Sequence, residues 1–201
     1  MSSVAAMPLD ADELVWRMPV ERYHAMIRTG VLTDDDRLEL LEGVLVEKMS
    51  KNPGHRIATR RTCDALRSVL PVGWYADEQA PITTADSEPE PDICIVRGST
   101  NDYADRHPGP ADVALVVDVA DSSVRRDRGT KKRIYARAGI AAYWLIDLAA
   151  RTLEVYTESQ GADFGRRAVL TEGDEVSLVL EGEVIASLPV GEFFAERGSR
   201  G

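Results

Sequence analysis

The sequence predicts a single-domain α/β (α+β) protein in which helices flank a mixed β-sheet, and two apolar segments carry this prediction. VALVVDVA at 113–120 and IAAYWLIDL at 140–148 are nearly continuous apolar runs of strand length, a pattern typical of strands buried on both faces of a sheet. KKRIYARA between them has helical spacing and ends at Gly139. A strand–helix–strand unit implies a right-handed crossover and at least one parallel strand pair.

Turn residues and periodicity predict the other elements. We expect a flexible leader at 1–15, one domain at 16–196 and a flexible tail at 197–201. In the first half of the domain we expect a helix between Pro19 and Gly30, an acidic turn at 34–36, a hairpin or bent strand at 38–49, a turn at 52–54 and a helix at 55–70. A strand from Trp74, a strand at 92–96 and a loop at 97–112 come next. In the second half we expect a helix capped by Asp127, strands at 152–157, 167–170 and 175–186, and a helical turn at 191–197.

Composition narrows the class of protein. Apolar residues make up 44% of the 201 residues, which is enough for a continuous core. No apolar run approaches the roughly 20 residues of a membrane-spanning helix, and the first residues lack the basic and apolar segments of a signal peptide. We therefore expect a cytoplasmic protein without a membrane partner. Cys63 and Cys94 lack CxxC spacing, which favours buried free thiols over a zinc site or a disulfide framework.

The charge balance is acidic, with 24 Lys and Arg against 34 Asp and Glu and a net charge of −10. This disfavours a protein that coats nucleic acid through bulk charge, because phosphate contacts need local positive potential. It does not exclude a nuclease, since carboxylates that hold a metal lower the net charge while a local basic face remains. Candidates for such a face are Arg56, Arg60 and Arg61 on one segment and the region 125–133 on another.

Two carboxylates carry the functional prediction. Asp118 lies inside a strand that we expect to be buried on both faces, where a charge is costly unless it is paired, hydrogen-bonded or bound to a metal. Asp92 opens an apolar strand at the rim of the sheet. If neighbouring strands bring the two together, a divalent cation removes their repulsion, and oxygen ligands favour magnesium or manganese. The alternatives are a salt bridge from Asp118 to Arg125 or Arg126, and a turn aspartate at position 92.

Three further residues are candidates with structural alternatives. Lys131 lies on the helix after the Asp118 strand, from which it can position water or stabilise charge on a phosphate; the alternative is an exposed lysine like Lys132. Glu42 can add a carboxylate or can simply occupy a hairpin turn. His55 can contact phosphate or support another residue, or it can be a partly exposed residue at the start of a helix.

Several motifs together resemble one known family. LELLEGVLVEKMS, a histidine that opens a helix, EPEPDICIV, and the stretch from VALVVDVA to LEVY are similar to the Uma2 family of endonucleases, which have a restriction-endonuclease-like, PD-(D/E)XK fold. The resemblance covers roughly residues 16 to 196. Its most specific part is 118–147, where an acidic strand residue precedes D-x-G-x-K-x-x-x-Y and then YWLID.

The resemblance implies roles for individual residues. Pro91-Asp92 corresponds to the PD element and Asp118 to the second acidic position, where the family usually has glutamate. The usual lysine position is Ala120 here, and in this family the following helix carries the lysine. The residues that match functional positions of the family are Asp92, Asp118, Lys131, Glu42 and His55, with Tyr135 as possible support.

These observations lead to the hypothesis of a metal-dependent endonuclease that hydrolyses DNA. Asp92, Asp118 and the backbone carbonyl of Val119 would bind Mg²⁺ or Mn²⁺. Glu42 would bind the metal directly or through water, and Lys131 would orient the attacking water. Related nucleases often pair to place two sites on a duplex, which suggests a homodimer. The alternatives are a catalytically weak or inactive nuclease-fold protein with a binding or assembly role, and hydrolysis of another phosphate ester.

Overall fold

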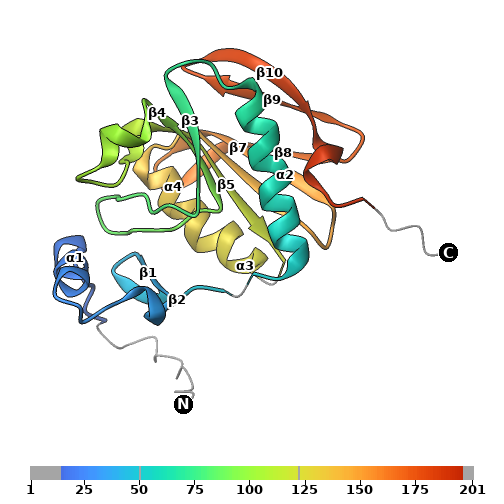
Figure 1. Ribbon diagram of the computed structural model, residues 1–201. Helices are drawn as coiled ribbons and strands as arrows, with labels where there is room; N and C mark the ends of the chain where they lie inside the picture. Colours follow the sequence, from blue (N-terminus) through green and yellow to red (C-terminus); the bar gives the residue numbers. More distant parts are fainter. Residues whose placement is uncertain (1–14, 50, 122, 197–201) are drawn as a thin grey trace.

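The centre of the molecule is a six-stranded sheet with the strand order β3-β4-β5-β6-β7-β8 (Figure 1). The computed structural model describes residues 15–49, 51–121 and 123–196, so the predicted tail and all but residue 15 of the predicted leader lie outside the described ranges. Strands β5 and β6 are parallel, and the other neighbouring strands of this sheet are antiparallel. This confirms the predicted mixed sheet and its parallel pair. The strands are β3 Trp74–Glu78, β4 Ile93–Arg97, β5 Val113–Ala120, β6 Ala142–Asp147, β7 Thr152–Gln160 and β8 Asp163–Thr171.

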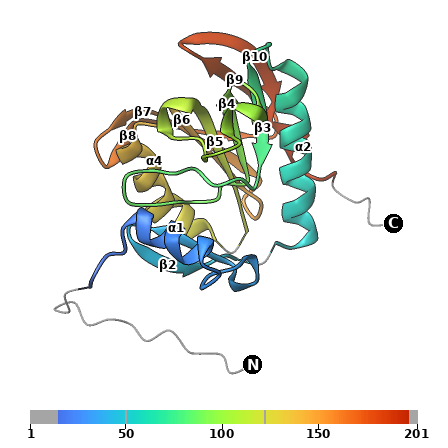
Figure 2. The ribbon, with the colours of Figure 1, turned by 60° about the vertical axis from the view of Figure 1, so that its left-hand side comes forward.

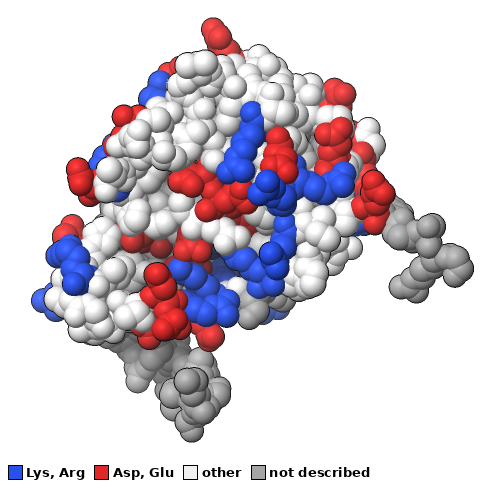
Figure 3. Space-filling view, in the orientation of Figure 1, with Lys and Arg blue, Asp and Glu red and all other residues white. Residues whose placement is uncertain are grey.

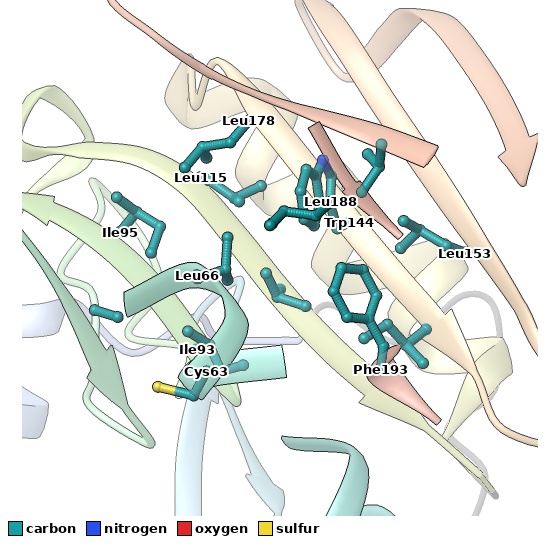
Figure 4. Close-up of a cluster of buried hydrophobic side chains, with 14 of the residues drawn as sticks. Cys63, Leu66, Ile93, Ile95, Leu115, Trp144, Leu153, Leu178, Leu188 and Phe193 are labelled. Carbon is teal, nitrogen blue, oxygen red and sulfur yellow. The ribbon is translucent and has the colours of Figure 1, made fainter. Parts of the chain in front are cut away.

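Each face of the sheet has its own apolar core. Helix α2 (Pro53–Val69) and the hairpin of β9 (Glu175–Leu180) and β10 (Glu183–Pro189) cover one face, together with the short helix η5 (Val190–Phe193). Helix α4 (Lys132–Ala138) covers the other face (Figure 2). Figure 4 shows side chains from α2, the central strands and the β9–β10 hairpin meeting in the first core. Because alternate residues of a strand point to opposite faces, β5 contributes to both cores, as its apolar run predicted.

The N-terminal part lies at the end of the sheet where β4 begins. Helix α1 (Val20–Arg28) precedes the short helix η1 (Asp34–Asp36), and β1 (Leu38–Leu41) and β2 (Val44–Glu47) form the predicted hairpin. The turn residues Glu42 and Gly43 both have positive φ angles, of 48° and 73°. A Cβ on Gly43 would lie 2.7 Å from the Cβ of Arg17, so close packing as well as φ requires glycine there. The backbone bridge between Leu40 and Glu88 joins the hairpin to the segment that leads into β4.

Helix α2 begins earlier than the sequence indicated. We expected a turn at 52–54, but Asn52 is the N-cap and Pro53 is the first helical residue. The Asn52 Oδ1 accepts a hydrogen bond of 2.9 Å from the backbone N–H of His55. This satisfies one of the free donors in the first turn, while proline loses nothing because its position needs no N–H partner. The cap therefore fixes His55 in the first turn.

The predicted capping role of Asp127 is wrong. The helical segment begins at α3 (Val124–Arg126) and continues through η4 (Asp127–Lys131), a π-helical turn, directly into α4. Asp127 therefore lies within the helical segment and is buried rather than at its exposed start. A π-helical turn is wider than an α-helical turn and is frequent at functional sites. Here its two ends, Asp127 and Lys131, are both buried.

Two other expectations need adjustment. The loop at 97–112 contains the short helices η2 (Thr100–Tyr103) and η3 (Pro110–Asp112). Strand β8 is longer than the predicted 167–170, because an exposed edge strand contains few of the apolar residues that reveal a buried one. No helix within the described ranges is long and apolar enough to cross a membrane.

Candidate active site

Strand register brings the two predicted carboxylates together. Ile93 of β4 pairs with Val117 of β5 in antiparallel register. Asp92, which precedes Ile93, therefore stands opposite Asp118, which follows Val117. Directly opposed residues on antiparallel strands have Cβ atoms about 5 Å apart and point to the same face. That face is the one covered by α4, because the alternate residue Val116 packs in its core. Convergence of Asp92 and Asp118 at one end of the sheet is thus a result of the fold.

Both carboxylates line a narrow pocket of about 60 Å³. The pocket lies between the first turn of α2, the hairpin β1–β2, the start of β4, the end of β5 and the π-helical turn. Its lining residues are Glu39, Lys48, Met49, Lys51, Asn52, His55, Glu90, Asp92, Asp118, Val119, Asp121, Ser123, Arg126, Asp127 and Lys131. The structure therefore brings together five of the residues that the sequence indicated: Asp92, Asp118, Lys131, His55 and Val119. The side chain of Val119 packs in the opposite core, so this residue presents its backbone to the pocket.

Asp92 is buried and held by three groups. Its Oδ2 accepts a hydrogen bond of 2.8 Å from the Val119 backbone N–H and lies 3.1 Å from His55 Nε2, while its Oδ1 lies 3.2 Å from Lys51 Nζ. Burial raises the pKa of Asp92, but the hydrogen bond with His55 and the charges of His55, Lys51 and Lys131 outweigh burial and hold this pKa below its usual value. The carboxylate is therefore ionised and fixed in orientation.

Asp118 is paired with Lys131 rather than with an arginine. Its Oδ1 accepts a hydrogen bond of 3.0 Å from Lys131 Nζ, and its Oδ2 accepts one of 3.1 Å from the Tyr143 hydroxyl. Burial raises the pKa of Asp118 to about 7; the Lys131 charge opposes this shift, and the negative charges of Asp127 and Asp92 add to it. Arg126, a predicted alternative partner, instead lies 3.9 Å from Glu39.

Lys131 connects the acidic side chains of the pocket. Besides Asp118, its Nζ donates to the Glu90 backbone carbonyl at 3.2 Å and lies 3.8 Å from Glu39 Oε2. Burial lowers the pKa of Lys131, but the charges of Asp118, Glu39 and further carboxylates outweigh burial and raise this pKa above its usual value. Lys131 is therefore a permanently charged hydrogen-bond donor at neutral pH, which suits stabilisation of negative charge but not proton abstraction.

Glu42 lies outside the pocket. Its two carboxylate oxygens accept hydrogen bonds of 2.7 Å from Arg133, and Arg137 lies 3.4 Å away. The hairpin instead presents Glu39 to the pocket. Glu39 is 3% exposed, and its Oε2 accepts a hydrogen bond of 3.1 Å from the Glu90 backbone N–H. A glutamate inside the apolar strand Leu38–Leu41 is the same signal that identified Asp118, and it could have indicated Glu39.

The sequence also did not indicate Asp127 and Lys51 as site residues. Asp127 lines the pocket and accepts a short hydrogen bond from Ser123 Oγ. Burial raises its pKa, although Lys131 opposes the shift. Tyr135, which we expected to support the site, is a fully buried residue of α4, and its hydroxyl has no hydrogen-bond partner among the described residues. The neighbouring Tyr143 contacts Asp118 instead.

Comparison with known protein families identifies the family of this chain. The model of the Uma2 family, described as "Putative restriction endonuclease", matches residues 20–190. The chain belongs to the Uma2 family. This confirms the resemblance seen in the sequence, and the match covers every residue that lines the pocket.

A solved structure has a similar fold. This chain is similar to the crystal structure of "a putative nuclease belonging to DUF820" from Anabaena variabilis ATCC 29413, with a TM-score of 0.65 and 17% sequence identity over 83% of this chain and 94% of that chain. At this identity the likeness shows the fold alone. No curated protein matches the chain. The fold class predicted from the sequence is confirmed.

The residues of this Uma2 pocket suit an oxygen-liganded divalent cation. Asp92 and Asp118 supply carboxylate oxygens on one face of the sheet, and repulsion among Asp92, Asp118 and Asp127 is part of what raises the pKa of Asp118. Added positive charge would relieve that repulsion. Within the described ranges, no group of three or more His, Cys, Asp or Glu side chains is placed to hold a metal ion. Two carboxylates with backbone and water oxygens suit magnesium, which usually keeps several waters, better than zinc.

Proposed function

We propose that this Uma2 protein is a metal-dependent endonuclease that hydrolyses DNA phosphodiester bonds. The observation that carries the proposal is the meeting of Asp92 and Asp118 on adjacent strands with Lys131 Nζ 3.0 Å from Asp118 Oδ1, all at one pocket. Two carboxylates can hold a divalent cation, and a charged lysine beside them can stabilise negative charge on a phosphate, so the set suits metal-assisted phosphodiester hydrolysis. The family description supports the same reaction class.

Each residue has a distinct role in this proposal. Asp92 and Asp118 would hold Mg²⁺ or Mn²⁺, with the backbone carbonyl of Val119 as a further oxygen ligand. When bound, the cation supplies Lewis acidity and neutralises phosphate charge. Lys131 donates hydrogen bonds to the attacking water or to the phosphate oxygen on which negative charge develops. His55 holds Asp92 in place through the 3.1 Å contact between Nε2 and Oδ2.

Glu39 replaces Glu42 as the hairpin residue of the site, with a positioning role instead of the metal-binding role expected of Glu42. It is the glutamate of the hairpin that lines the pocket, and its Oε2 lies 3.8 Å from the Lys131 ammonium. Its charge helps to keep Lys131 protonated. Glu39 therefore positions Lys131, and Glu42 fastens the hairpin to α4 through Arg133.

Cleavage of plasmid and linear duplex DNA in Mg²⁺ and in Mn²⁺ tests the proposal. We expect nicking or linearisation by the wild-type protein, loss of cleavage on chelation, and at least a hundredfold loss in Asp92→Asn. Asn keeps the shape of Asp92 but removes its charge, so the variant tests the charge of the side chain rather than its volume. Thermal unfolding with and without Mg²⁺ gives an independent readout, in which the wild-type protein is stabilised and the variant much less so.

A second candidate function is a nuclease-fold protein with a binding or assembly role and little catalysis. The hydrogen bonds of Asp118 favour it, because Lys131 and Tyr143 already donate one to each of its carboxylate oxygens. Absence of cleavage on any DNA substrate, together with equal thermal stability in Mg²⁺ and in chelator, would support this candidate and overturn the first.

A further inference from the structure

Positive charge is concentrated on two helical segments that reach the pocket. Helix α2 and the segment 124–138, which comprises α3, η4 and α4, together contain 11 of the 24 Lys and Arg but only 2 of the 34 Asp and Glu. The remaining chain is therefore far more acidic than the net charge of −10 suggests. Figure 3 shows Lys and Arg gathered along α2 and toward α3 on this side of the molecule. A polyanion would be attracted to these segments and repelled elsewhere.

Most of these cations already have acidic partners. Arg60 pairs with Asp64, Arg128 with Glu154 and Asp147, Lys131 with Asp118, Lys132 with Asp163, and Arg133 and Arg137 with Glu42. Arg56 of α2 and Arg125 of α3 are different. Both are exposed, and neither side chain makes an ion pair or hydrogen bond among the described residues. Their full charge is available to a ligand.

Arg56 and Arg125 lie outside the pocket, on the two helical segments that reach it, and each is next in sequence to a residue that lines it. Arg56 follows His55, which lines the pocket from α2, and Arg125 precedes Arg126, which lines it from α3. Each also lines an open hollow in the surface, Arg56 one beside α2 and Arg125 one beside α3. Arg56 lies in the first turn of α2, where the helix dipole adds partial positive charge.

We propose that a DNA backbone crosses the mouth of the pocket from the start of α2 to α3, and that Arg56 and Arg125 contact its phosphates on either side of the reacting bond. This inference rests on the proposed function, since it defines how the same site binds its substrate. Contacts of this kind position the backbone without reading bases. The acidic interior of the pocket remains for the metal and the scissile phosphate.

Binding of a short fluorescent DNA duplex, measured by anisotropy in chelator over a range of salt concentrations, tests the inference without cleavage. We expect Arg56→Gln and Arg125→Gln each to weaken binding severalfold and to reduce the slope of log affinity against log salt by about one, because each removes one phosphate contact. Arg166→Gln is the matched control. Arg166 is an exposed arginine on the edge strand β8 that also lacks an ion pair among the described residues, and its replacement should change neither quantity.

The outcomes separate the inference from the proposed function. The proposed contacts of Arg56 and Arg125 with the DNA backbone are called the footprint here. Unchanged affinity and salt slope in both Arg56→Gln and Arg125→Gln, or equal losses in Arg166→Gln, would overturn the footprint even if the protein cleaves DNA. Reduced binding confined to the first two variants would support the footprint even if the cleavage test fails. Failure of the wild-type protein to bind the duplex at low salt would also reject the footprint.

Discussion

Asp118 and Lys131 form a buried ion pair across thirteen residues of sequence, with 3.0 Å between Oδ1 and Nζ and exposed fractions of 2% and 7%. Lys131 is the last residue of the π-helical turn η4, and Asp118 lies near the end of β5. A buried ion pair is tolerated only while both charges are present, because removal of one leaves the other buried without its neutralising charge.

Replacement of Lys131 with Met should therefore destabilise the protein strongly. We expect the free energy of unfolding to fall by about 3 kcal/mol, since Asp118 loses its cation in a buried site. Lys132→Met is the matched control: Lys132 pairs with the largely exposed Asp163, and such pairs contribute about 0–1 kcal/mol. Urea unfolding measures both values. The double variant Asp118→Asn/Lys131→Met should recover part of the loss, with a coupling of about 1 kcal/mol or more. Equal stability of the two single variants would contradict the paired arrangement.

The neighbouring tyrosines provide a second comparison. Tyr135 and Tyr143 are both fully buried with ring centroids 5.0 Å apart, but only Tyr143 donates a hydrogen bond, to Asp118. Tyr143→Phe should lower the free energy of unfolding by about 1–2 kcal/mol, because it removes a hydrogen bond to a buried carboxyl group. Tyr135→Phe should change it by less than about 0.5 kcal/mol or raise it, because that hydroxyl has no partner among the described residues. A larger loss in Tyr135→Phe than in Tyr143→Phe would show that the two hydroxyls have the opposite roles.

The sequence predicted the strands and the two aspartates because burial leaves a signal in the residues themselves. The apolar run 113–120 predicted a strand buried on both faces, and Asp118 stood out as the one charge within it. Asp92 lies at a strand opening, where a structural turn aspartate is equally at home, and the resemblance to the Uma2 family singles it out as part of the PD element. The register of β4 on β5 explains why the two carboxylates meet.

Other features depend on contacts that local sequence does not contain. Asp127 has the residue type of a helix cap, and only packing against the sheet shows that the helix begins earlier and widens at this point. Glu39 and Glu42 lie three residues apart on one hairpin. The turn at Glu42–Gly43 and the arginines of α4 draw Glu42 to the surface, whereas strand alternation and the bond to the Glu90 N–H direct Glu39 inward.

A comparison of these two glutamates tests this revision of the site. Glu39→Gln should reduce DNA cleavage by about 10- to 100-fold, the usual range for a residue that positions a catalytic or metal-binding group. Glu42→Gln should leave the cleavage rate nearly unchanged, since its carboxylate contacts Arg133 and Arg137 outside the pocket. Initial rates under saturating Mg²⁺ measure both. A greater loss of rate in Glu42→Gln would restore the role that the sequence suggested for Glu42.

Glu42 should instead affect stability, with a defined dependence on pH. The hydrogen bonds from Arg133 are the largest cause of its lowered pKa; burial opposes them, and the charges of Arg133 and Arg137 assist them. A carboxylate with a lowered folded-state pKa stabilises the protein above its unfolded-state pKa of about 4.5, and this stabilisation is lost as the pH falls through the folded-state value. Glu42→Gln should thus lower the free energy of unfolding by about 1 kcal/mol at pH 7. The difference from wild type should shrink below pH 4.5, the ordinary pKa of the carboxyl group.

Urea unfolding between pH 3 and pH 7 measures this difference, with Glu183→Gln on the exposed surface of β10 as the control variant. A wild-type advantage that stays constant across this range would mean that shape, not charge, accounts for the contribution of Glu42.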